Sequence, residues 1–152
     1  MANPSRSWAI ILALQTQLST ITVANGYLTD IGKQVWVTEN QRPSAVALGL
    51  MIYSGPILGS GIDNERPGKP VREFTIYVEA AIGTDQDDAQ QQIHNVIEDV
   101  EECMKAYAKA QAMRLELNQV KPMAVTDIAI LDRPEGAVDM VMVANVVARY
   151  FR

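Results

Sequence analysis

The segment from Val71 to Ile82 alternates between two sets of side chains with a period of two residues. This pattern is typical of a strand in an antiparallel sheet with one buried face. The inward set is Phe74, Ile76, Val78 and Ala80, and the outward set is Glu73, Thr75, Tyr77 and Glu79. The chain must therefore build a sheet and cover the apolar face of that sheet with a second layer.

Two amphipathic segments can supply this second layer. Residues 5–23 are expected to form a first helix, with Asn3 as its N-cap and Pro4 at its first position. Residues 85–112 are expected to form a longer helix, in which Thr84 and Asp87 resemble a capping box. The first apolar stripe is Trp8, Ile11, Leu12, Leu18 and Ile21, and the second is Ala89, Ile93, Val96, Ile97, Val100, Met104 and Tyr107.

The segment from Ile21 to Val35 links the first helix to the sheet. Asn25-Gly26 is expected to end the helix, because glycine readily adopts a positive φ. The same dipeptide also occurs in two-residue hairpin turns. The helical stripe before it favours the helix stop, and the chain then leads into a short strand at 34–38.

Three further segments are expected to be strands. Residues 44–53 are apolar at nearly every position, which is typical of a strand covered on both faces. Residues 124–132 and 137–151 are joined by a turn at 133–136. The last strand has one apolar face and one mixed face, and the mixed face carries Asp139, Val141, Val143, Asn145, Val147, Arg149 and Phe151.

The expected order of elements is α-β-β-β-α-β-β, without an internal repeat. We therefore predict an α+β fold in which two helices pack on one mostly antiparallel sheet. The length of 152 residues suits a single domain over 1–152. Within it, residues 54–70 are expected to form a long loop, and loops of that length are often functional.

Composition argues against several classes of protein. The net charge of −5 argues against nucleic-acid coating and against direct recognition of a nucleic-acid sequence. Cys103 and His94 are the single cysteine and histidine of the chain, which excludes an intrachain disulfide and the usual zinc sites. The apolar run at 8–14 is too short to span a bilayer, and no cleavage site follows it. We expect a cytosolic start and no membrane contact.

No residues with a catalytic arrangement are expected either. His94 and Glu98 share a helix face, but Glu101 and Glu102 continue that face as a solvated acidic surface. Cys103 is expected in the core, more than two helical turns from the histidine that would have to activate it.

The glycine-rich part of the expected loop offers no phosphate site. Gly68-Lys69 resembles the end of a phosphate-binding loop, but Pro70 follows where Ser or Thr is required, and no helix begins there. We therefore expect a protein without enzymatic activity, metal or cofactor.

Apolar side chains remain that one helical layer cannot cover. The expected loop carries Ile57, Leu58 and Ile62, which either fold back onto the core or are covered by another protein. The mixed face of the last strand adds Val141, Val143 and Val147. The most economical account is oligomerisation through the sheet into a closed symmetric assembly.

One part of the chain resembles a known family. The residues that carry the likeness are Leu18-Ser-Thr-Ile21, Ala24-Asn-Gly-Tyr27, Thr29-Asp30, Gly32 and Val35. Together with the long connection, the single long helix and the final strand pair, they resemble the tail terminator proteins of long-tailed, siphovirus-type bacteriophages. The likeness in organisation covers nearly the whole chain, and the residue-level likeness covers about fifteen positions.

The resemblance implies a structural virion protein at the neck end of the tail, assembled in the host cytoplasm. Such proteins form a hexameric ring that caps the tail tube, ends its polymerisation and offers a docking surface to head-neck connector proteins. The family has no catalytic residues to transfer. Its contact positions are not a fixed motif that can be transferred, so the contact residues come from the apolar pattern. Val141, Val143 and Val147 are expected to make subunit contacts, and Ile57, Leu58 and Ile62 to contact the tail-tube protein or a neighbouring ring.

Two alternatives stay open from sequence. A neck or head-completion protein would dock on head particles instead of tail tubes. A small dimeric binding module would hold an apolar ligand against the uncovered sheet face.

Overall fold

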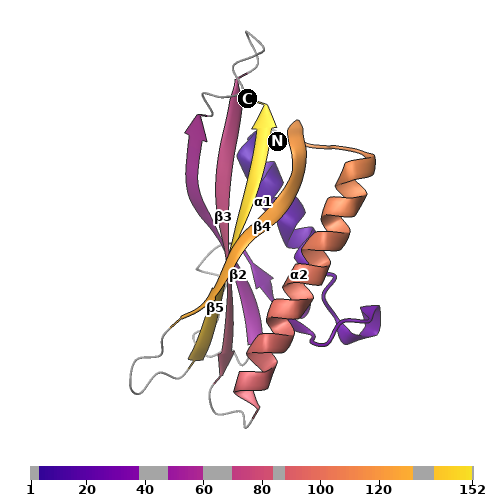
Figure 1. Ribbon diagram of the computed structural model, residues 1–152, viewed down its shortest axis with the longest axis vertical. Helices are drawn as coiled ribbons and strands as arrows, with labels where there is room; N and C mark the ends of the chain where they lie inside the picture. The colour runs from indigo at the N-terminus through magenta and orange to yellow at the C-terminus, as the bar shows by residue number, and fades with distance from the viewer. Residues whose placement is uncertain (1–3, 38–47, 60–69, 84–87, 132–138, 152) are drawn as a thin grey trace.

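The computed structural model of the chain describes residues 4–37, 48–59, 70–83, 88–131 and 139–151 (Figure 1). It contains two α-helices, α1 (Arg6–Leu18) and α2 (Ala89–Met113), and two short 3₁₀ helices at Val23–Asn25 and Ile31–Lys33. The strands are β1 (Val35–Trp36), β2 (Leu48–Gly59), β3 (Val71–Gly83), β4 (Gln119–Ile130) and β5 (Asp139–Phe151). The order of α-helices and strands is α-β-β-β-α-β-β, as predicted.

The strands form one sheet in the order β1-β2-β3-β5-β4. The β1 strand pairs with β2 in parallel through Val35 and Leu50, and the other three pairings are antiparallel. The long pairing between β3 and β5 runs without interruption from Val71 opposite Phe151 to Gly83 opposite Asp139. The mostly antiparallel α+β fold is therefore confirmed.

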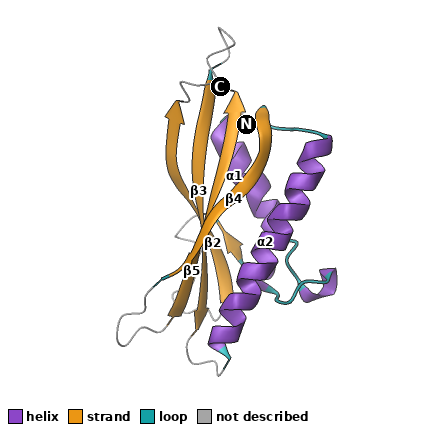
Figure 2. Ribbon diagram, viewed as in Figure 1, coloured by secondary structure: helices purple, strands orange, loops and turns teal. Residues whose placement is uncertain are grey.

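Both helices lie on the same side of the sheet (Figure 2). The core fills the space between the helices and the sheet. It is built from the alternate strand residues that face the helices, together with the buried stripes of the helices. It includes Ile10, Leu14 and Leu18 of α1, Ile93, Val96 and Val100 of α2, Leu50 and Ile52 of β2, Phe74, Ile76 and Val78 of β3, and Met142, Ala144 and Val146 of β5. We call the side of the sheet that faces away from the helices the open face.

The first helix is shorter than predicted. Its N-cap is Ser5, whose Oγ accepts a hydrogen bond from the Trp8 N–H at 3.3 Å, and the predicted cap Asn3 lies outside the described residues. The helix ends at Leu18 instead of continuing to residue 23, and the Ser19 hydroxyl donates to the Gln15 carbonyl at 2.7 Å. Trp8 is 38% exposed, because the buried stripe runs through Ile10 and Leu14 instead.

Gly26 does adopt a positive φ, of 92°, but it closes the 3₁₀ helix at Val23–Asn25 and not α1. The hydroxyl of Ser19 and the side chain of Asn25, which donates to the Thr20 carbonyl at 2.8 Å, help to form this tight connection. The chain then reaches β1, which is limited to Val35–Trp36 where residues 34–38 were predicted.

The predicted loop at 54–70 is wrong in its first part. Residues 54–59 continue β2, because β3 offers them pairing partners as far as Arg72, opposite Gly59. A register shift between Ser54 and Ile57 absorbs an extra residue beside Pro56, in the manner of a β-bulge. Residues 60–69 lie outside the described part of the chain.

The boundaries of α2, β4 and β5 also differ from the predicted ones. Helix α2 begins at Ala89, and Thr84 and Asp87 of the predicted capping box lie outside the described residues. Strand β4 begins at Gln119, five residues before the predicted start, and β5 is described from Asp139. No described helix is both long enough and apolar enough to cross a membrane.

Candidate assembly surface

The open face carries all three of the valines that were predicted to make subunit contacts. Val141, Val143 and Val147 are half-buried on β5, whereas Met142, Ala144 and Val146 face the helices and are buried. Across the pairing with β4, Val143 lies opposite Ala129 and Val147 lies opposite Ala124. We call these three valines and two alanines the valine strip.

Polar side chains interrupt the open face. Tyr77, Asn145 and Asp127 lie in one row across β3, β5 and β4. Near the end of the sheet that carries the C-terminus, Arg149 Nη2 and Glu73 Oε2 form a half-exposed ion pair at 3.6 Å. The open face therefore carries half-buried apolar rows with polar rows between them.

The end of β2, residues 54–59, is a second apolar surface. Ile57 is 46% exposed and Leu58 is 59% exposed. Ile57 lies opposite Phe74 on the helix side, and Leu58 lies opposite Glu73 on the open face, because directly paired residues share a face. The third predicted residue, Ile62, lies outside the described residues.

A groove of about 510 Å³ separates α2 from the edge strand β4. Sequence reasoning did not anticipate it, because it arises only when the helix packs beside the last strand of the sheet. We call it the β4 groove. Its lining combines apolar side chains with charged ones from both elements: Glu101, Met104, Lys105, Ala108, Met123, Ala124, Val125, Thr126, Asp127 and Ile128.

One buried amide fixes the end of this groove. Gln111 is almost fully buried on α2, and its Oε1 accepts a hydrogen bond from the Met123 N–H at 2.9 Å. Strand β4 is irregular here, with register shifts on either side of Lys121. The amide therefore satisfies a backbone donor at the point where the regular pairing is interrupted.

The segment from Ile21 to Val35 is attached to α2 by a buried carboxylate. Asp99 is 2% exposed and accepts three hydrogen bonds: Leu28 N–H at 2.9 Å, Thr29 N–H at 2.8 Å and Thr29 Oγ1–H at 2.7 Å. Sequence reasoning missed Asp99. The available signal was its spacing, since position 99 lies between Val96 and Cys103 on the apolar stripe of the helix.

Further contacts hold the same segment internally. Asp30 Oδ1 accepts a hydrogen bond from the Val23 N–H at 2.9 Å, and this bond lowers the pKa of the Asp30 carboxyl. Burial is the main cause that raises the pKa of the Tyr27 hydroxyl, and the neighbouring Cys103 thiol is the second cause. These contacts give the polar side chains of the segment from Ile21 to Val35 a structural role.

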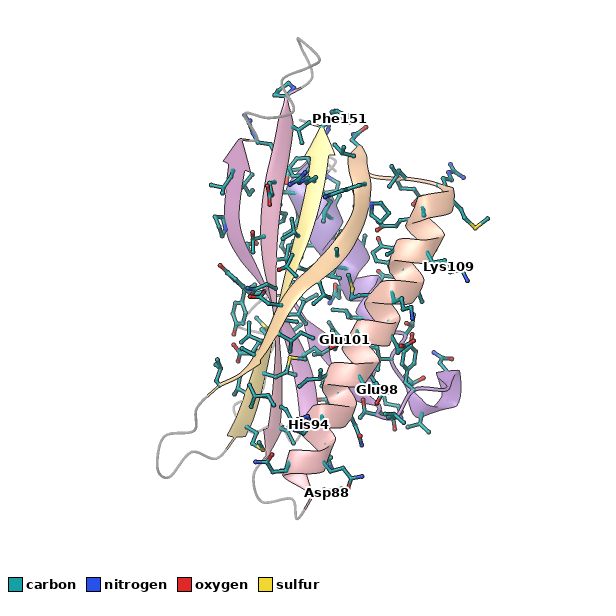
Figure 3. The ribbon with its side chains drawn as sticks, in the orientation of Figure 1. Asp88, His94, Glu98, Glu101, Lys109 and Phe151 are labelled. Atoms are coloured by element: carbon teal, nitrogen blue, oxygen red, sulfur yellow. The ribbon has the colours of Figure 1, made fainter. Side chains whose placement is uncertain are left out.

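The residues weighed as catalytic candidates lie where sequence reasoning placed them. Figure 3 shows His94, Glu98 and Glu101 along α2, and all three are exposed. Cys103 is fully buried, and its thiol donates to the Gln17 carbonyl at 3.3 Å. Among the described residues, no group of three His, Cys, Asp or Glu side chains could hold a metal ion.

Comparison with known proteins adds no assignment. No protein-family model matches the chain, and no curated protein matches its sequence.

Proposed function

We propose that the chain is a structural virion protein of the tail-terminator kind. In this proposal its subunits form a ring that caps the tail tube, ends its polymerisation and presents a docking surface for head-neck connector proteins. The ground for proposing this kind of ring is the resemblance of the segment from Leu18 to Val35 to tail terminators. The hexameric state is part of the same resemblance.

The observation that supports assembly is the half-buried valine strip; elsewhere on the open face Met51 and Ala81 are already buried. Both helices pack on one face, so the valine strip on the other face has no cover from the described part of the chain. Burying apolar area is worth about 25 cal/mol per Å² removed from water. Association through this face therefore supplies a driving force that the monomer leaves unused.

Sedimentation velocity and electron microscopy of the purified chain test the proposal. The measurements are made alone and after mixing with the tail-tube protein encoded in the same genome. Rings, and tubes of finite length with a cap at one end, are the expected result. A chain that stays monomeric at high concentration and with tube protein would refute the proposal.

The same preparation separates the two alternatives. Binding to head particles without binding to tubes would identify a neck or head-completion protein. A dimer that retains an apolar ligand in native mass spectrometry would identify a small binding module.

A further inference from the structure

The two edges of the sheet differ in what they present. On one side, β1 covers β2 only at Leu50 and Met51, and no other described strand pairs with the outer edge of β2. On the other side, no described strand pairs with the outer edge of β4. Unpaired edges of this kind are templates for association with another chain.

Both faces beside the β4 edge carry apolar side chains among polar ones. The β4 groove lies on the helix side, with Met104, Met123 and Val125 in its lining. The valine strip lies on the open face and includes Ala124 and Ala129 of β4 itself. A strand placed along this edge would direct its alternate side chains onto these two surfaces.

The β2 end has the matching pattern. Its exposed apolar side chains, Ile57 and Leu58, are consecutive and therefore point to opposite faces of the sheet. They cannot reach the β4 edge of their own chain, because β3 and β5 lie between and put the two edges roughly 14 Å apart. A second copy of the chain can bring the two surfaces together.

Charge on the helix side agrees with this match. Arg72 lies opposite Gly59, and its Nη1 is 3.2 Å from the place where a Cβ at Gly59 would stand. The absence of a side chain at Gly59 therefore lets the guanidinium lie over the β2 end. The β4 groove carries the exposed carboxylate of Glu101 on the helix side, with Lys105 one helical turn away.

We infer that the β2 end of one subunit docks along the β4 edge of the next. Ile57 enters the β4 groove, Leu58 covers the valine strip, and Arg72 approaches Glu101. The contact uses two different surfaces, so it is heterologous and closes into a ring or continues as a filament. Pro56 and Pro122 each lack a backbone donor, so side chains carry most of this contact.

This inference rests on the proposed ring. It assigns Ile57 and Leu58 to the contact between subunits instead of the contact with the tail-tube protein. Cysteine cross-linking tests it. The double variant Leu58→Cys with Ala124→Cys, treated with a short bismaleimide, should give a ladder of covalent oligomers. Each single variant should give none, because a heterologous contact does not place a residue beside its own copy.

A control pair replaces Ala124→Cys by Leu28→Cys, at an exposed residue that bonds to Asp99 of α2 and does not line the β4 groove. This pair should give no ladder. Rings seen by microscopy without a ladder from the test pair would overturn the inference and leave the proposed ring intact. Cross-linking of Leu58→Cys only to added tube protein would also overturn it. A chain that stays monomeric under all conditions would refute both this inference and the proposed ring.

A charge exchange gives an independent measurement. Arg72→Glu should raise the concentration for half-assembly about tenfold, since it places two carboxylates together at the contact. Glu101→Arg in the same chain should recover most of that loss. Equal weakening in the single and double variants would contradict the assigned pairing.

Discussion

Asp99 connects the longest helix to the segment that precedes the sheet. Its carboxylate is almost fully buried, and three donors from Leu28 and Thr29 satisfy it. A buried carboxylate without such partners would be strongly unfavourable. The three bonds therefore explain how a charged side chain can occupy the apolar stripe of α2.

Replacing Asp99 by alanine should lower the free energy of unfolding by about 2–4 kcal/mol, because the buried Thr29 N–H and hydroxyl and the part-buried Leu28 N–H lose their acceptor. Urea unfolding at a fixed protein concentration measures this loss. Glu98→Ala, at the exposed neighbouring position on the same helix, should change stability by no more than about 0.5 kcal/mol. Similar losses from both variants would mean that the carboxylate contacts add little.

Gly32 and Gly26 are required for different reasons. A Cβ at Gly32 would lie 2.6 Å from the carbonyl oxygens of Leu18 and Ile21, whereas a Cβ at Gly26 would meet nothing within 4 Å. Gly26 instead has a φ of 92°, which side chains other than those of Asn and Asp rarely tolerate.

Gly32→Ala should therefore destabilise the fold by about 1–3 kcal/mol through a clash with backbone. Gly26→Asn should cost less than about 1 kcal/mol, since asparagine accepts the left-handed conformation. Thermal unfolding followed by circular dichroism compares the two variants. A Gly26→Asn variant less stable than Gly32→Ala would contradict these assignments.

At the scale of elements, the alternating segments were predictable from sequence because burial of one sheet face imposes a period of two residues. The residues on the predicted apolar faces of β3 and β5 are buried, including Phe74, Ile76, Met142 and Val146. Both helices and the order of elements follow from the same kind of pattern. These features depend only on near neighbours in the sequence.

The extension of β2 was not predictable in this way. Ser54, Gly55 and Pro56 are typical of a turn, and only the length of β3 beside them keeps them in the sheet. The β4 groove likewise depends on where α2 lies relative to the sheet edge. The open face carries four of the predicted contact residues: Val141, Val143, Val147 and Leu58. The sequence also predicted that a single helical layer would leave one face of the sheet without helices.

The link between α2 and β4 depends on Gln111. Gln111→Leu should lower the free energy of unfolding by about 1–3 kcal/mol, because the Met123 N–H loses its acceptor in a buried place. Lys109→Gln, at an exposed position of the same helix, is the matched control and should be nearly neutral. Hydrogen exchange at Met123 reports the same bond, and unchanged protection in Gln111→Leu would refute its role.

At the scale of the whole molecule, the proposed assembly gives the two faces of the sheet different roles. Its helix side holds the core, and its open face carries half-buried valines beside polar rows. Substitutions on the open face should therefore change the association of subunits more than the folding of each subunit. The polar rows limit the contiguous apolar area that the free subunit exposes to water, which agrees with the proposed assembly.

Val143 offers the sharpest test of this division, because it lies opposite Glu79 on one side and Ala129 on the other. Val143→Lys places an ammonium group across from a carboxylate, an arrangement that paired strands tolerate well. The monomer should keep its stability within about 1 kcal/mol, while a buried charge without a partner in the next subunit should abolish assembly.

The control is Val143→Thr, which keeps the shape of the side chain and should weaken assembly far less. Sedimentation velocity measures association, and urea unfolding of the same samples measures folding. If Val143→Lys assembled like the unsubstituted chain, the open face would be excluded as a subunit contact. The valine strip would then be left for the tube or the connector, and the β4 groove alone would have to hold the ring together.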